Sequence, residues 1–146
     1  MKAGGFKRWG VGGALVGALA LGGCSSMPGM HEQTWTMATT DKIPSAVGKV
    51  KVKEEKDGNT RVKVEVAHLA QPNDVFDATT YVVWLKPRTG LAQNVGVLNV
   101  DKKLNGSIET RTPFKDFTIL VTAERSANAT MPTGQSVMDT KVVIPS

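Results

Sequence analysis

Few residues of this chain belong to the types that carry out covalent or metal chemistry. Among its 146 residues there are one cysteine, Cys24, and two histidines, His31 and His68. A single cysteine excludes an internal disulfide and any zinc or iron–sulfur site built from several thiolates of one chain. A serine hydrolase needs a nucleophile, a base and an orienting acid, and the chain contains no Gly-x-Ser-x-Gly elbow. We therefore expect a protein that is not an enzyme and that holds no cofactor.

The residues that precede Cys24 have the pattern of an export signal. Residues 1–10 carry Lys2, Lys7 and Arg8 without any acid, and residues 11–23 carry no charge. A basic segment followed by a short apolar run is typical of a secretory signal peptide. The apolar run is shorter than the roughly 20 residues that a membrane-spanning helix needs. We expect residues 1–23 to be a signal peptide that is cleaved off.

The apolar run ends in Leu21-Gly22-Gly23-Cys24, followed by Ser25. These four residues resemble the lipobox of bacterial lipoproteins. The resemblance implies a diacylglycerol thioether on the Cys24 sulfur, cleavage after Gly23 and acylation of the new amino terminus. Two or three acyl chains hold a protein stably on a bilayer, at about 0.8 kcal/mol per buried methylene. We expect a lipid-anchored protein of the cell envelope. Because Ser25 rather than aspartate follows Cys24, its place would be the outer membrane, on the periplasmic face or at the surface, where the cell has one.

Cleavage also removes most of the positive charge. Residues 1–23 hold three of the 18 Lys and Arg residues and none of the 13 Asp and Glu residues, so the formal charge falls from +5 to +2. A basic pI that comes mainly from a leader does not indicate nucleic-acid binding. We expect the partners to be the membrane, through the anchor, and an envelope protein or polymer.

Residues 24–46 contain the lipidated cysteine and a stretch rich in Ser, Thr, Met, Pro and Gly, without sustained periodicity. This composition predicts a flexible tether. Thioether and imidazole side chains suit Cu(I), so a copper-handling lipoprotein is an alternative function. Its ligands would be Met27, Met30, His31 and Met37. The other interpretation is that these residues simply reflect the composition of a loose segment.

After residue 46 apolar and polar residues alternate with a period of two, which is typical of β-strands. Residues 48–53 and 61–66 predict a hairpin with one valine-rich face, and Asp57-Gly58-Asn59 has strong turn chemistry. Further strands are predicted over residues 79–86, 94–101, 107–111, 116–124 and 136–144. Seven short strands without a clear helix indicate an all-β, immunoglobulin-like antiparallel sandwich over residues 47–146.

The polar face of the predicted hairpin is rich in cations. It carries Lys49, Lys51, Lys53, Arg61 and Lys63. Such a stripe suits anionic lipid head groups, lipopolysaccharide or wall polymers. It also fits a solvated face whose lysines oppose aggregation, with the nearby acids diluting its field. Both interpretations remain open at this stage.

The second half of the sandwich resembles a known family. Between Tyr81 and Lys141 a Y-x-x-W-L strand, a G-x-L strand, a V-T-x-E strand end and a P-T-G loop look like the extracytoplasmic domain of anti-sigma-K-type factors. The corresponding residues are Tyr81, Trp84, Leu85, Gly96, Leu98, Val121, Thr122, Glu124, Pro132, Thr133 and Gly134. The resemblance implies an immunoglobulin-like sandwich. Those regulators also carry a cytoplasmic sigma-binding helical domain and a transmembrane helix, which we do not find in this sequence, so sigma-factor regulation is not carried over.

These features predict a membrane-anchored lipoprotein with a non-catalytic binding or structural domain. Its contact surfaces would be the loops at residues 88–94 and 125–135, at one end of the sandwich. Four aromatic residues are expected to pack in the core rather than to line a ligand pocket, namely Tyr81, Trp84, Phe114 and Phe117. A small envelope enzyme that uses two of the scattered carboxylates is a further alternative.

Overall fold

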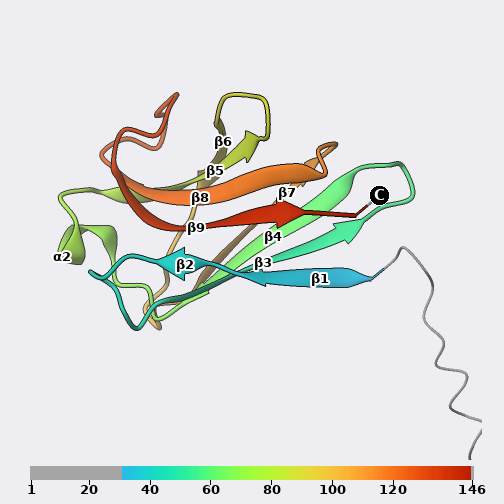
Figure 1. Ribbon diagram of the computed structural model, residues 1–146. Helices are drawn as coiled ribbons and strands as arrows, with labels where there is room; N and C mark the ends of the chain where they lie inside the picture. The colour runs from blue at the N-terminus through green and yellow to red at the C-terminus, as the bar shows by residue number, and fades with distance from the viewer. Residues whose placement is uncertain (1–30, 146) are drawn as a thin grey trace, which may run out of the picture. The chain divides into compact units, whose positions relative to one another are not determined.

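Alternating valines build the first of two sheets. A computed structural model describes residues 31–145 of the chain. Strands β3 (Val47–Glu54) and β4 (Thr60–Ala67) form the expected antiparallel hairpin. Its inward face consists of Val50, Val52, Val62, Val64 and Val66, all at most 4% exposed. Strands β1 (Glu32–Thr36) and β7 (Gly106–Thr112) flank the hairpin, and the order is β1-β3-β4-β7 (Figure 1).

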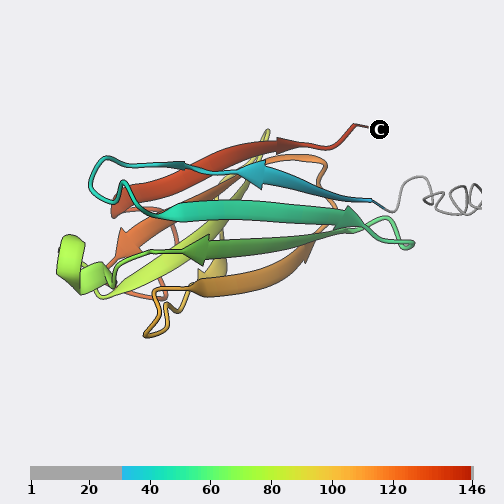
Figure 2. The same ribbon diagram turned by 90° about the horizontal axis from the view of Figure 1, so that it is seen from below.

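The second sheet has five strands in the order β2-β9-β8-β5-β6. Its centre is β8 (Asp116–Glu124), between β5 (Thr80–Pro87) and β9 (Gln135–Val143). Strands β6 (Gln93–Val97) and β2 (Ala38–Thr39) form its edges. Figure 2 shows the two sheets lying face to face. A single turn of helix, α2 (Pro72–Val75), precedes β5. No helix among residues 31–145 is long and apolar enough to cross a bilayer.

The predicted all-β sandwich is confirmed. All seven expected strands form: β3, β4 and β7 lie in one sheet, and β9, β8, β5 and β6 in the other. From β3 onward the chain crosses between sheets after β4, β6 and β7, as in immunoglobulin-like sandwiches. The predicted strand 94–101 is shorter than expected because β6 ends at Val97. The backbone N–H of Leu98 then donates to the carbonyl of Tyr81, and the Leu98 side chain is buried.

The prediction of a flexible tether up to residue 46 is wrong for the part that the structure describes. Strand β1 pairs with β3, and β2 pairs with β9, so the chain passes from one sheet to the other at Met37. Met37, Ile43 and Ala46 are at most 6% exposed and belong to the core. Burial of apolar side chains offsets the entropy of ordering this segment. The sandwich therefore begins at Glu32 rather than at residue 47.

The core between the sheets is closed by large side chains of the five-stranded sheet. Tyr81, Phe117 and Ile119 are at most 1% exposed. The Tyr81 hydroxyl donates a hydrogen bond of 2.6 Å to the carbonyl of Ala70, which ties the segment after β4 to β5. Burial, with a smaller contribution from the charge of Asp74, raises the pKa of Tyr81 to about 12. This tyrosine is therefore an uncharged structural residue.

Candidate functional site

The residues of the predicted lipidation site lie outside the described part of the chain. This holds for Leu21, Gly22, Gly23 and Cys24, and also for Met27 and Met30 of the copper alternative. The described chain begins with His31, which is exposed and directly precedes β1. Lipidation therefore stays a prediction from sequence.

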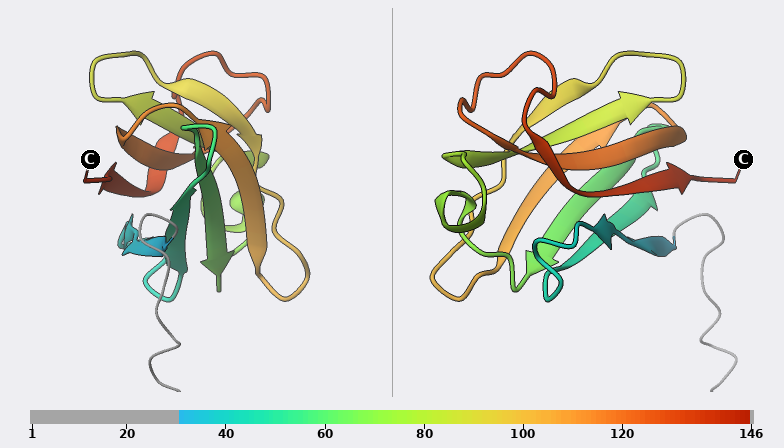
Figure 3. Two further views of the ribbon diagram at one scale, coloured as in Figure 1. Left: turned by 90° about the vertical axis from the view of Figure 1, so that its right-hand side faces the viewer. Right: turned by 60° about the vertical axis from the view of Figure 1, so that its left-hand side comes forward.

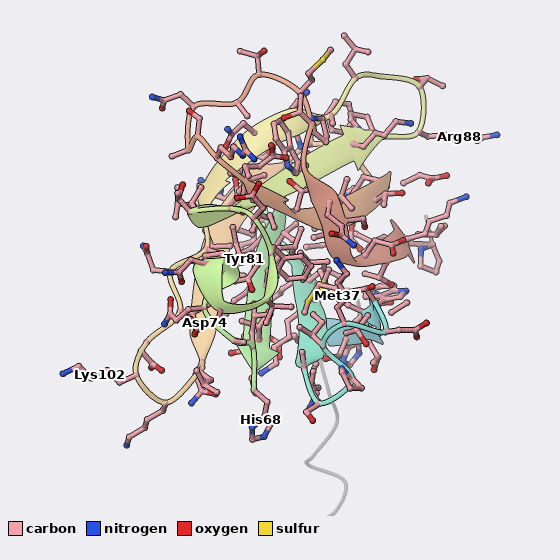
Figure 4. The ribbon with its side chains drawn as sticks, turned by 90° about the vertical axis from the view of Figure 1, so that its left-hand side faces the viewer. Met37, His68, Asp74, Tyr81, Arg88 and Lys102 are labelled. Atoms are coloured by element: carbon pink, nitrogen blue, oxygen red, sulfur yellow. The ribbon has the colours of Figure 1, made fainter. Side chains whose placement is uncertain are left out.

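The structure describes two of the four residues of the copper alternative, Met37 and His31, and both histidines of the chain. Met37 is 4% exposed and packs in the core, so its assignment to a loose copper-binding tether is wrong. The two histidines lie at opposite ends of the β3–β4 hairpin: Glu32, next to His31, pairs with Lys53, whereas Ala67, next to His68, pairs with Val47. Figure 4 shows His68 pointing away from the body of the protein and Met37 pointing into it.

The five cations of the predicted stripe do lie on one face, the outer face of the four-stranded sheet, and acids are interleaved with them. Glu65 bridges Lys51 at 3.0 Å and Lys63 at 3.3 Å. The hydrogen bond and charge of Glu65 raise the pKa of Lys51, and the Lys51 hydrogen bond lowers the pKa of Glu65 despite its partial desolvation. Lys49 and Lys53 have no acidic partner within 4 Å among the described residues. Among the described residues, the stripe is thus a surface of mixed charge in which Lys49 and Lys53 are the two cations without an ion pair.

The β3–β4 turn neutralises a further pair of cations. Glu55 accepts from Arg61 at 3.3 Å and from Arg111 at 2.9 Å, and Asp57 accepts from Arg111 at 2.7 Å. The Asn59 backbone N–H is the main cause that lowers the pKa of Asp57. These ion pairs reduce the positive charge of the face next to the β3–β4 turn.

At the other end of this sheet the surface forms an open groove of about 620 Å³. Lys49, Glu65 and Ser107 contribute from the outer face of the sheet. Asn99, Asp101 and Asn105 contribute from the β6–β7 connection, where the Asp101 carboxylate accepts from the backbone N–H groups of Lys103 and Asn105 at 2.8 and 3.0 Å. A groove with amides, a hydroxyl and both signs of charge suits a polar, hydroxyl-rich ligand.

A buried polar network lies on the outer face of the five-stranded sheet. Trp84 alternates away from the core-facing Val83 and Leu85 and is nevertheless 0% exposed. Its indole N–H donates to the Thr122 hydroxyl at 2.8 Å, and that hydroxyl donates to Glu124. The Glu124 carboxylate, in a residue 2% exposed, also accepts from the Thr133 hydroxyl at 2.7 Å and from the backbone N–H of Gly134 at 3.0 Å.

The hydrogen bonds to Glu124 outweigh the effect of its burial. Burial by itself raises the pKa of this carboxyl group. The hydrogen bonds from Thr122, Gly134 and Thr133 more than compensate, so its pKa lies below the ordinary value. A carboxylate that is charged and has its acceptor sites filled is a structural group rather than a proton donor.

This network fixes the β8–β9 loop. A Cβ atom at Gly134 would lie 1.7 Å from the Ala123 carbonyl oxygen, so only glycine allows this close approach. Asn94 of β6 donates to the carbonyls of Ala127 and Ala129 at 3.1 and 2.9 Å. The loop is therefore held over the sheet from both sides.

The loops at residues 88–94 and 125–135 do not share one end of the sandwich, as the sequence suggested. Thr80 pairs with Glu124 and Pro87 with Phe117, so the loops leave opposite ends of the β5–β8 pair. Both rise on the outer side of the five-stranded sheet, as the two views of Figure 3 show. Asn94 connects them across that face. Leu91 at 87% and Met131 at 62% are their exposed apolar residues.

The expectation for the aromatic residues is confirmed for three of them. Tyr81, Trp84 and Phe117 are buried, although Trp84 lies on the outer face of its sheet. Phe114 is 37% exposed in the β7–β8 turn, so its assignment to the core is wrong.

Comparison with known proteins leaves the family open. No protein-family model and no curated protein matches the chain. Trp84, Thr122, Glu124, Thr133 and Gly134, on which the resemblance to anti-sigma-K-type factors partly depends, meet in a single network that stabilises the fold.

Sequence reasoning did not anticipate the groove. Residues 102–105 form a turn before β7, but nothing local in the sequence indicates that this turn faces Lys49 and Glu65. That proximity follows from the pairing of β4 with β7, which places Ser107 opposite Glu65. A polar turn beside a polar strand face is the only signal in the sequence.

Proposed function

We propose that this protein is a lipid-anchored lipoprotein of the cell envelope, whose β-sandwich is a non-catalytic binding or structural module. Cys24 carries the acyl chains, which hold the module on a membrane. The mixed-charge groove at Lys49, Glu65 and Asp101 is its contact surface for a polar envelope polymer or protein. In a cell with an outer membrane, that membrane is the location that Ser25 favours.

The observation that carries the proposal is the short distance in sequence between the lipobox and the folded domain. Only residues 25–31 separate Cys24 from the first residue of β1. Acylation of Cys24 therefore fixes the whole sandwich close to a bilayer. A one-chain anchor would bind reversibly, whereas the two or three chains that a lipobox implies bind stably.

The geometry of the polar groups supports a binding role. The buried carboxylate of Glu124 is occupied by structural hydrogen bonds. The acids of the β3–β4 turn are occupied by arginines. The groove instead offers exposed amides and charges of both signs, which bind ligands without changing them.

Replacement of the cysteine tests the anchor. In Cys24→Ser cells fed an alkyne fatty acid, we expect no label on the protein and its loss from the membrane fraction. Ser26→Ala, two residues further along, is the matched control and should be labelled like the parent. Equal labelling of Cys24→Ser and the parent would refute the proposal.

A further inference from the structure

One end of the sandwich is where the chain leaves towards Cys24. Glu32, the first residue of β1, pairs with Lys53 at the end of β3. The β3–β4 turn, the β7–β8 turn and the last residues of β9 lie at this same end (Figures 1 and 3). We call residues 54–59, 113–115 and 143–145 the anchor end.

The chain between the anchor and the domain is short. Eight Cα–Cα steps separate Cys24 from Glu32, which span at most about 28 Å when fully extended. A flexible chain of this length has a mean end-to-end distance of roughly 15 Å. A strand of eight residues is itself about 27 Å long. The anchor end therefore lies within about 28 Å of the proposed acylated residue, whereas the opposite end can lie about one strand length further away.

Hydrogen bonds and an ion pair connect the segments of the anchor end. The Lys115 ammonium pairs with Glu54 at 3.0 Å and donates to the carbonyl of Gly58 at 3.2 Å and to the Thr60 hydroxyl at 3.0 Å. The backbone N–H of Ile144 donates to the carbonyl of Lys115 at 2.8 Å. These contacts connect the three segments of the anchor end to one another.

This surface carries exposed apolar side chains and little net charge. Phe114 is 37% exposed and Val143 is 49% exposed. Glu54, Glu55 and Asp57 are each paired with a cation, so they repel anionic head groups only weakly. Lys56 is exposed at the tip of the β3–β4 turn, where an ammonium group can meet lipid phosphates.

We propose that the anchor end lies against the phospholipid bilayer that holds the acyl chains. Phe114 and Val143 enter the head-group region, and the groove at the opposite end faces away from the membrane. This inference rests on the proposed function, because without acylated Cys24 nothing holds the domain at the surface. With the anchor in place the contact is intramolecular, so even weak apolar contacts suffice to orient the domain.

The single cysteine makes a direct test available. In the lipidated protein the Cys24 sulfur is a thioether, so an introduced cysteine is the only free thiol for a bimane fluorophore. The chain offers two matched pairs of sites at opposite ends. Phe114→Cys is compared with Leu104→Cys, both 37% exposed, and Val143→Cys with Val47→Cys, at 49% and 43%. The lipidated variants are placed in vesicles of phosphatidylethanolamine and phosphatidylglycerol that contain a lipid with a nitroxide on its head group.

We expect the nitroxide to remove about half of the bimane emission at positions 114 and 143, and almost none at 104 and 47, about 25 Å further out. Equal quenching within both pairs, or stronger quenching at 104 and 47, overturns the orientation while leaving the lipid anchor intact. A free Cys24 thiol in the parent protein, seen as bimane labelling without any introduced cysteine, instead overturns the proposed function and this inference with it. Two pairs keep the test decisive if one variant folds poorly.

Discussion

The carboxylate of Glu124 is a buried charged group that is stabilised by hydrogen bonds. Water is replaced by donors from Thr122, Thr133 and Gly134, which come from the same strand and from the loop that follows it. Hydrogen bonds to charged groups contribute more than those between neutral groups, and loss of one partner leaves the others unsatisfied. This residue therefore connects the end of β8 to the β8–β9 loop and, through Thr122, to Trp84.

Glu124→Gln is expected to lower the free energy of unfolding by about 3 kcal/mol. The amide NH₂ would face the N–H and O–H donors of Thr133 and Gly134, and the charge-assisted bonds would be lost. Urea denaturation followed by tryptophan fluorescence measures the change. Glu109→Gln, on the exposed face of β7, is the control and should change stability by less than about 0.5 kcal/mol. Similar small losses in both variants would contradict a structural role for Glu124.

Acid should unfold the protein in part through the same residue. The pKa values of Glu124, Glu65 and Asp57 are lowered by folding, so the folded state binds fewer protons than the unfolded state at acidic pH. The ionised carboxylates stabilise the folded state fully at pH values above their pKa in the unfolded chain, which is about 4. This stabilisation is lost as the pH falls through their lower pKa values in the folded protein. Unfolding free energies measured at several pH values between about 7 and 3 should fall less steeply for Glu124→Gln than for the parent. Parallel profiles would contradict the lowered pKa of Glu124.

At the scale of elements, the two short strands at the start of the domain complete the sandwich. Strand β1 extends the four-stranded sheet and β2 extends the other, with Met37 between them. The backbone N–H of Met37 donates to the carbonyl of Gly48 at 2.8 Å. A Cβ atom at Gly48 would lie 2.5 Å from the Met138 sulfur and 3.0 Å from that of Met37, so the glycine makes room for both.

Met37→Ala should therefore destabilise the protein by about 2–3 kcal/mol, because it leaves a cavity in the core. The matched control is Met131→Ala, since Met131 is 62% exposed in the β8–β9 loop, and its effect should stay below about 0.5 kcal/mol. Both values come from urea denaturation. If Met37→Ala were as mild as the control, β1 and β2 would not belong to the cooperative unit.

The elements differ in how far the sequence determines them. The β3–β4 hairpin is predictable because Val50, Val52 and Val64 alternate strictly with charged residues. Strands β1 and β2 cannot be predicted from alternation in the same way. Each has too few apolar residues, such as Trp35, to show a period of two. The Glu124 network is not predictable, because Trp84 and Thr122 meet only through the register of β5 with β8. In the sequence, the sign of this network is that polar residues, Thr122 and Glu124, occur within a largely apolar strand.

At the scale of the whole molecule, the sandwich begins only a few residues after Cys24, and its polar groove lies at the end opposite to the start of β1. Cys24 lies at most about 28 Å of chain from Glu32, so the proposed acylation of Cys24 would hold the sandwich near a membrane. The fold could be predicted from the sequence. The proposed orientation of the sandwich relative to a membrane could not, because it depends on the order of the strands. The ion pairs on the β3–β4 turn partly neutralise the end of the cation stripe at Arg61.

The intact mass of the protein purified from membranes of its own cells tests the lipid anchor most directly. We expect a chain that begins at Cys24 and is heavier than the polypeptide by a diacylglycerol group and, where the amino terminus is acylated, by one further acyl chain. Fragmentation should place this mass on Cys24. A chain that retains residues 1–23 and carries an unmodified Cys24 would contradict the anchor, the location and the orientation together.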